Sequence, residues 1–265
     1  MRVLNVCNLK GGVGKTITST NMAYVLATLH KKRVLVIDND KQGNTSKFFG
    51  AHGYDAPTLA EIMLVQKIAK DVIQHTQYDG IDIIPANMNL LGANKNVMLD
   101  TMNPQQTRLK KALKEVETEY DYCIIDNAPD VNMSVINALT AGDDFIIPVK
   151  VDRYTFDGVD IMLEYAQQIR ESFNERLTFR GCLVTNFRYN DVNLQGIEYL
   201  KKQRKYWLLE SVINWTAKVD ESTFACLPVT VHSPRCGAAR GYKAFANEYL
   251  HLIGDVSESN TKGEK

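Results

Sequence analysis

The chain has 265 residues, with 31 Lys and Arg against 31 Asp and Glu, and 45% of its residues are hydrophobic. This length suits one α/β domain whose core needs no disulfide or metal to hold it together. The composition is that of an ordinary globular protein, which excludes collagen, coiled coil and disorder as descriptions of the whole chain. A net charge of zero excludes a globally basic protein, although a local basic face can still bind nucleic acid.

Short apolar runs alternate with helical patterns along the chain. The runs predict β-strands at residues 2–8, 33–38, 81–85, 122–126, 145–149, 179–185 and 211–213. Several are continuously apolar, which is typical of strands buried on both faces of a parallel sheet. Helical spacing is found at residues 17–29, 104–120, 156–173, 193–206 and 241–253. This alternation predicts a doubly wound α/β fold, a mostly parallel sheet with helices on both faces, over residues 1–253, followed by a disordered tail at 254–265.

The cysteines and histidines offer no cofactor site by their spacing. The five cysteines lie at positions 7, 123, 182, 226 and 236 without a C-x-x-C motif, and the first three fall in apolar runs. This pattern predicts reduced, mostly buried thiols in a cytosolic protein. The five histidines are scattered and suggest no metal-ligand cluster. We expect neither a signal peptide nor a membrane span, since no apolar run has the length for one.

The most informative segment is K-G-G-V-G-K-T at residues 10–16, which follows the first predicted strand and precedes a helical pattern. Glycines here let backbone N–H groups turn toward phosphate oxygens, and the dipole of the following helix favours the same anion. Lys15 is expected to reach the β- and γ-phosphates, and the Thr16 hydroxyl to coordinate Mg²⁺. The standard pattern G-x-x-x-x-G-K-[ST] fails at its first position, where Leu9 stands in place of glycine.

This loop resembles that of the deviant Walker A ATPases of the ParA/MinD group, whose pattern K-G-G-x-G-K-[ST] it matches at every fixed position. The resemblance covers the chain from residue 1 to about 253 and implies a P-loop NTPase that uses ATP. It also implies that Lys10 is a signature lysine, which contacts phosphates across a dimer interface in place of an arginine finger. The ATP-binding residues are then Lys10, Gly11, Gly12, Val13, Gly14, Lys15, Thr16 and Ile17.

Two carboxylate segments resemble motifs of the same family. D-N-D-K-Q-G-N at residues 38–44 is similar to the switch segment D-x-D-P-Q-G-N, with Lys41 in place of proline. The strand that ends at Asp126 looks like a Walker B strand. Carboxylates at the carboxyl ends of parallel strands point into the ligand crevice of such a sheet. The resemblance implies that Asp40 positions or activates the attacking water. The expected catalytic residues are Lys10, Lys15 and Asp40, and the expected magnesium site is Thr16, Asp38 and Asp126.

Asn186 closes the sixth predicted strand. The resemblance suggests that its side chain meets the adenine of ATP, with residues 231–235 covering the base. An asparagine at the end of a strand is also a common turn residue, so both interpretations stay open.

The family resemblance leaves three classes of partner. Nitrogenase iron-protein relatives bind an iron–sulfur cluster through exposed cysteines, but Cys123 and Cys182 fall in predicted strands. MinD-like members bind membranes through a C-terminal amphipathic helix, and the helical pattern at 241–253 lacks the basic face of such helices. ParA-like members bind DNA without sequence preference as an ATP dimer, and a ParB-like adaptor stimulates them.

The DNA hypothesis has its own support in charge, because residues 201–243 carry eight Lys and Arg against three Asp and Glu. Such a cluster can neutralise DNA phosphates by counterion release, and the alternative is a solvated helix face. The candidate DNA contacts are Lys201, Lys202, Arg204, Lys205, Lys218, Arg235 and Arg240.

The glycine loop and its carboxylates predict a Mg²⁺-dependent ATPase, and the family resemblance implies that it is slow without its partner and acts in DNA segregation. We expect an ATP-bound homodimer that binds nonspecific double-stranded DNA, a ParB-like adaptor, no membrane anchor, and a cytoplasmic, nucleoid-associated location. No helix-turn-helix precedes the first predicted strand, so the sequence resembles the short ParA type. The alternative is a MinD-like ATPase that positions a protein complex at a membrane, and the cargo stays open between plasmid and chromosome.

Overall fold

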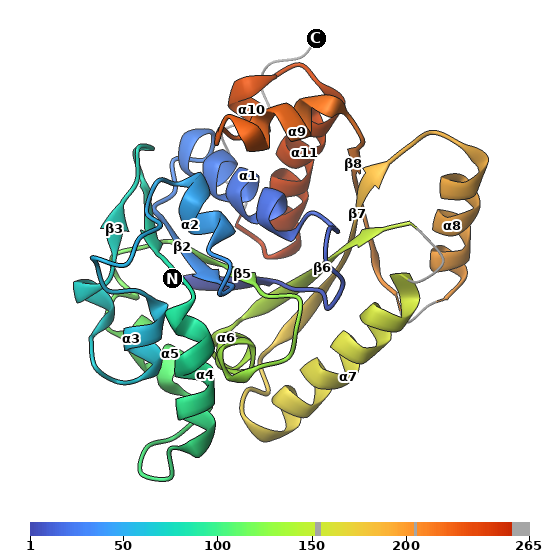
Figure 1. Cartoon of the computed structure of the whole chain (residues 1–265). Helices are drawn as coiled ribbons and strands as arrows, with labels where there is room; N and C mark the ends of the chain where they lie inside the picture. Colours follow the sequence, from blue (N-terminus) through green and yellow to red (C-terminus); the bar gives the residue numbers. More distant parts are fainter. Residues whose placement is uncertain (152–154, 204–205, 256–265) are drawn as a thin grey trace.

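The computed structural model describes residues 1–151, 155–203 and 206–255, and its centre is an eight-stranded sheet in the order β3-β4-β2-β5-β1-β6-β7-β8 (Figure 1). The strands are β1 (Arg2–Val6), β2 (Val34–Asn39), β3 (Gln74–His75), β4 (Ile81–Ile84), β5 (Tyr122–Asn127), β6 (Asp144–Lys150), β7 (Thr178–Phe187) and β8 (Leu208–Asn214). Neighbouring strands are parallel except β3, which pairs antiparallel with β4. The predicted doubly wound fold is confirmed, and the antiparallel edge strand β3 adds to it.

Helices cover both faces of this sheet (Figure 1). They are α1 (Lys15–Thr28), α2 (Asn44–Phe48), α3 (Leu59–Met63), the 3₁₀-helix η1 (Ala69–Asp71), α4 (Asn89–Leu99), α5 (Arg108–Lys114), α6 (Met133–Ala141), α7 (Thr155–Ser172), α8 (Asp191–Lys202), α9 (Ala217–Phe224), α10 (Val229–His232) and α11 (Gly237–Leu252). Alternate residues of the central strands point to opposite faces, as strand geometry requires. In β1, for example, Leu4 packs under α1 and α11, whereas Val3 packs under the layer of α3 to α6.

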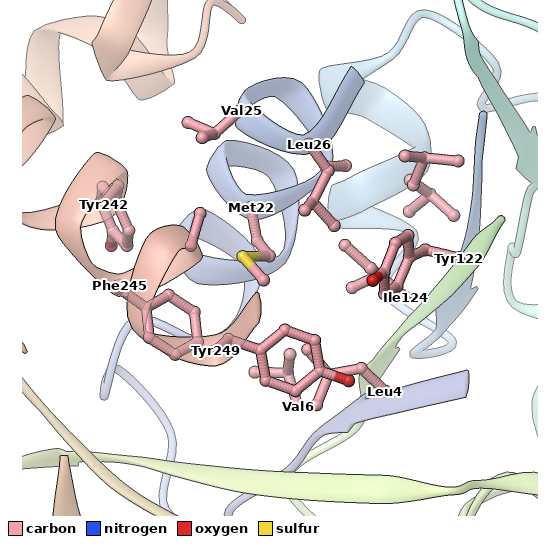
Figure 2. Packing of buried hydrophobic residues seen from close by; sticks show 14 of the residues in the cluster. Leu4, Val6, Met22, Val25, Leu26, Tyr122, Ile124, Tyr242, Phe245 and Tyr249 are labelled. Carbon is pink, nitrogen blue, oxygen red and sulfur yellow. The ribbon is translucent and has the colours of Figure 1, made fainter. Parts of the chain in front are cut away.

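The core beneath α1 joins two distant parts of the chain. Met22 and Leu26 of α1 lie between the sheet and α11, where Phe245 and Tyr249 pack against them (Figure 2). These side chains are fully or almost fully buried. The apolar stripe of α11 therefore belongs to the core, as the absence of a basic face predicted. Among the described residues, no helix combines the length and the apolar character needed to cross a bilayer.

Several predicted boundaries were wrong. The helix expected at 104–120 is only α5, Arg108–Lys114, because the backbone N–H groups of Arg108 and Leu109 donate to Asn137 Oδ1 (2.8 and 3.2 Å), and this contact starts the helix late. Helices α4 and α6 were not predicted. At the other end, Asp255 accepts a hydrogen bond from Lys32 Nζ at 2.7 Å, and residues 256–265 of the expected tail lie outside the described residues.

Three cysteines confirm the expected burial, whereas the other two do not share it. Cys7, Cys123 and Cys182 are buried, Cys226 is exposed and Cys236 is half-buried. Burial raises the pKa of the Cys7 and Cys182 thiols to about 12. These buried thiols are therefore protonated and act as small apolar core residues.

Candidate functional site

The loop between β1 and α1 is held by contacts at both ends. Asn8 is buried, and its Nδ2 donates to the Pro148 carbonyl at 2.7 Å while its Oδ1 accepts from the Lys10 N–H at 2.9 Å. At the far end, Thr185 Oγ1 donates to the Val13 carbonyl at 2.8 Å. These contacts fix the loop to β6 and β7.

Two glycines of this loop have backbone conformations that only glycine adopts freely. Gly12 has φ of 73°, and Gly14, which caps α1, has φ of 84°. Both angles are costly for any residue with a Cβ atom. The N-terminus of helix α1 follows directly, and the backbone N–H groups and dipole at such a helix end favour anions. The predicted phosphate-binding context of strand, glycine loop and helix is therefore present.

Lys15 is the first residue of α1 and lies inside the site. Its Nζ donates to the Lys10 carbonyl at 3.1 Å, so the side chain folds back across the loop. Burial lowers the pKa of Lys15, and the charges of Asp126 and Asp40 oppose that shift. Because burial outweighs these two charges, a further anion such as a phosphate would stabilise the buried ammonium.

The two strand-end carboxylates face each other across neighbouring strands. Asp38 of β2 and Asp126 of β5 are register partners, and both are buried. Burial and the charge of Asp126 together raise the pKa of Asp38 to about 7, although hydrogen bonds from Ser46 oppose the shift. Burial also raises the pKa of Asp126. Two buried carboxyl groups in this arrangement repel each other unless a cation or a proton lies between them.

Hydroxyl groups surround both carboxylates. Asp126 accepts hydrogen bonds from Thr16 Oγ1 at 2.7 Å, Thr45 Oγ1 at 2.6 Å and Ser19 Oγ at 3.2 Å. Asp38 accepts from the N–H and the Oγ of Ser46, both at 2.7 Å. The structure therefore brings Thr16, Asp38 and Asp126 into one cluster.

This donor set fits magnesium. Mg²⁺ prefers hard oxygen ligands, usually takes one or two carboxylates from the protein, and completes its shell with water and substrate phosphates. Thr16, Asp38 and Asp126 supply a hydroxyl and two carboxylates beside the glycine loop. The described residues contain no group of three or more His, Cys, Asp or Glu side chains able to hold a metal by themselves.

Asp40 lies on the loop after β2, beside this cluster and half-buried. Its N–H donates to Asp38 Oδ1 at 3.1 Å, and its own Oδ1 accepts from the Gln42 N–H at 2.9 Å. The loop ends at Gly43, which has φ of 63°. The carboxylate is thus placed next to the phosphate loop without being buried with Asp38.

Asn186 follows Thr185 directly, so it lies at the edge of the same loop. It is half-buried and has φ of 51°, which is uncommon for a residue other than glycine but tolerated by asparagine. This backbone conformation fits the turn interpretation.

The basic candidates that the structure describes lie in two places. Lys201 and Lys202 end α8, ahead of the first residue of β8, whereas Lys218 lies on α9, after its last residue. The seven residues of β8 separate these groups by roughly 20 Å along the strand. Arg235 and Arg240 are exposed on the α9 side, whereas Arg204 and Lys205 lie outside the described residues.

The described candidates of residues 201–243 therefore fall into two groups, and their contact with DNA stays a prediction. Sequence proximity misled because β8 runs between the two groups. Lys218 is also paired, since its Nζ lies 2.7 Å from Glu221 Oε2. Two separate groups of candidate contacts remain, one at each end of β8.

Sequence reasoning missed the polar residues that orient the site. Asn8, Ser19, Thr45, Ser46 and Thr185 all bond to the loop or the carboxylates. The available signal was the density of hydroxyl residues in T-I-T-S-T after the loop and in N-T-S after Gly43.

Comparisons with known proteins agree with this geometry. A family profile described as an AAA domain matches residues 1–179. Sporulation initiation inhibitor protein Soj of Bacillus subtilis is 33% identical over 249 residues, covering 93% of this chain and 97% of the relative. Chromosome partitioning protein ParA of Caulobacter vibrioides is 30% identical over 254 residues, covering 94% of each chain. The structure of cobyrinic acid a,c-diamide synthase from Mycobacterium smegmatis, with bound ATP analog and magnesium, matches with a TM-score of 0.83 at 25% identity over 97% of both chains.

Proposed function

Because this chain belongs to the ParA/Soj family of P-loop ATPases, we propose that it is a DNA-partitioning ATPase whose ATP-bound dimer binds DNA without sequence preference. The observation that carries the chemical part is the buried Lys15 beside the register-paired carboxylates Asp38 and Asp126. The family supports partitioning or positioning as the biological role, and the similarity to Soj and ParA favours partitioning.

In this proposal the residues of the site divide the chemistry of phosphoryl transfer. Lys15 binds the β- and γ-phosphates, and Lys10 reaches the nucleotide of the partner protomer. Asp40 orients the attacking water, while Thr16, Asp38 and Asp126 hold Mg²⁺. When bound, the metal neutralises charge that develops on the phosphate oxygens. Most of the catalysis is then positioning, which suits a loop that is already formed.

The dimer would act as a switch between two DNA affinities. ATP shifts an equilibrium only through its preference for one state, and a bridging Lys10 would supply that preference. Hydrolysis removes the γ-phosphate, so the dimer dissociates and releases its DNA. A ParB-like adaptor would stimulate this step, and the ATP-bound form would be found on the nucleoid.

The membrane alternative has less support. The apolar side chains of α11, including Phe245 and Tyr249, are buried against α1 and the sheet. They are therefore not available to enter a lipid interface without unpacking the core.

The deciding experiment is binding to random-sequence duplex DNA with ATP, ADP or no nucleotide, across a salt series. We expect binding only with ATP and a steep loss with salt, because phosphate contacts release counterions. Lys15→Ala should abolish both nucleotide and DNA binding. ATP-dependent dimerisation without any DNA binding would overturn the DNA proposal, and binding to anionic liposomes would then favour the membrane alternative.

The two basic groups can be compared with matched double variants. Arg235→Ala with Arg240→Ala removes two charges beyond the carboxyl end of β8, and Lys201→Ala with Lys202→Ala removes two at its other end. ATP binds at the carboxyl edge of the sheet, so we expect the arginine pair to weaken ATP-dependent DNA binding more. Each lost phosphate contact should reduce the salt slope by about 0.9.

The adenine role of Asn186 needs a variant that keeps the backbone. Asn186→Ala would add backbone strain at a φ of 51°, whereas Asn186→Gly removes the amide and allows that angle. Weaker ATP binding in Asn186→Gly would support the contact with adenine. Unchanged affinity would leave Asn186 as a turn residue.

A further inference from the structure

The loop that carries Asp40 is joined to the loop after β5 at two levels. At the buried level, Asn39 Nδ2 donates to Asn127 Oδ1 at 2.8 Å, and these residues are register partners on β2 and β5. At the surface, Lys41 Nζ lies 3.3 Å from Asp130 Oδ2. The first contact fixes the stem of the loop, and the second joins its tip to the neighbouring loop.

Asp130 is itself anchored. Its Oδ1 accepts a hydrogen bond from Asn132 Nδ2 at 2.6 Å. Asn132 is the N-cap of α6, because its Oδ1 accepts from the Val135 N–H at 3.0 Å. Lys41 is thus paired with a carboxylate that is fixed to the start of a helix.

The far end of the Asp40 loop is also fixed. Gly43 is buried, and a Cβ atom there would lie 2.7 Å from the Ala86 carbonyl, so the backbone packs closely at this point. Residues 40–42 therefore form a short bridge between two fixed ends. Within that bridge, Asp40 Oδ1 accepts a hydrogen bond from the Gln42 N–H at 2.9 Å. Lys41 makes the contact with the loop after β5.

We propose that Lys41 and Asp130 are a positioning pair that holds the Asp40 loop in place for the chemical step. This inference rests on the proposed function, in which Asp40 orients the attacking water. In the switch segment that the sequence resembles, proline stands at this position, and proline restricts the backbone by fixing φ. Here the ion pair supplies the restraint that the proline ring would give.

The size of the pair's effect on the hydrolysis rate can be predicted. The side chains of Lys41 and Asp130 are 32% and 42% exposed, so solvent screens their attraction. Exposed pairs of this kind have modest coupling, which corresponds to a change of about two- to fivefold in a rate that depends on them. Salt should weaken the pair, because the screening length is about 10 Å at 0.1 M ionic strength.

The test measures steady-state ATP hydrolysis by Lys41→Met, Asp130→Asn and the charge swap Lys41→Asp with Asp130→Lys. We expect kcat to fall about two- to fivefold in each single variant with KM for ATP unchanged, because the loop acts in the chemical step. High salt should lower kcat of the unmodified protein toward that of the variants. Both the charge swap and Lys41→Pro should recover most of the rate.

A matched control removes an ion pair elsewhere. Lys70 Nζ lies 2.5 Å from Glu119 Oε1, and these side chains are 53% and 44% exposed. Lys70→Met should therefore leave kcat, KM and the salt response unchanged.

The proposed pair would be overturned if Lys41→Met and Asp130→Asn kept the kcat and the salt response of the unmodified protein. An increase in KM alone would overturn it too, because Lys41 would then be a nucleotide contact. Failure of the proposed function is seen separately, as absence of ATP turnover in the unmodified protein.

Discussion

Substituting Asn127 by leucine should destabilise the fold through the amide groups that it leaves unpaired. Asn127 accepts from Asn39 Nδ2 at 2.8 Å and donates to Asn5 Oδ1 at 3.1 Å, and Asn5 Nδ2 in turn donates to the Ala138 carbonyl at 3.1 Å. The three asparagines are at most 1% exposed, so water cannot replace the lost partner. They form a chain of amides across β2, β5 and β1.

The magnitude follows from counting the groups left without a partner. Asn127→Leu leaves Asn39 Nδ2 and Asn5 Oδ1, and each buried unsatisfied group costs about 1–3 kcal/mol. The expected loss is therefore about 2–6 kcal/mol in the free energy of unfolding. Replacing Asn39 by leucine as well removes one of these groups, so the double variant should be about 1–3 kcal/mol more stable than Asn127→Leu.

Urea unfolding of the two variants and the unmodified protein, followed by circular dichroism, measures these differences. A loss below about 0.5 kcal/mol for Asn127→Leu would place the variant within the range of ordinary surface substitutions and refute the reasoning. So would a double variant less stable than Asn127→Leu, because the asparagines would then not act as a chain.

Three further predictions test separate features of the molecule. Gly43→Ala should lower the free energy of unfolding by about 1–2 kcal/mol because of its φ of 63°, and by more because of the close contact with the Ala86 carbonyl. Gly50→Ala, at a φ of 71° with open space around it, should show only the first loss, and equal shifts of the urea midpoint would argue against the contact. Thr185→Val should weaken ATP binding about two- to tenfold in calorimetry, because its 2.8 Å bond to the glycine loop is lost, and unchanged affinity would contradict that role. Burial lowers the pKa of His30, so its neutral form stabilises the fold above the ordinary histidine pKa of about 6.5, and this stability is lost as pH falls. His30→Gln should therefore flatten the acid side of the curve of stability against pH, and an unchanged curve would refute the assignment.

Much of the sheet and of the phosphate site could be predicted because their signals are local. Continuous apolar runs mark strands buried on both faces, and the predicted runs include each parallel strand of the sheet. Asp38 and Asp126 could be placed together because the carboxyl ends of parallel strands share one edge, and their register pairing confirms it. The glycine loop needs no tertiary information, since its residue types are dictated by backbone angles.

The rest depends on contacts between segments far apart in sequence. The late start of α5 is set by Asn137, which lies 29 residues after Arg108, so no local pattern indicates it. Thr45 and Ser46 bond to carboxylates that their own helix does not contain. The basic residues looked like one cluster because a linear count ignores the strand that separates Lys202 from Lys218.

The packing of α1 against α11 also sets the order in which the site can mature during synthesis. The helix that begins with Lys15 completes its core only when Phe245 and Tyr249 have arrived, more than two hundred residues later in the chain. At a ribosomal rate of about 5–20 residues per second, that delay lasts on the order of ten seconds or more. Until then the side of α1 that packs against α11 has no cover, and this part of the core stays incomplete until Tyr249 has been synthesised.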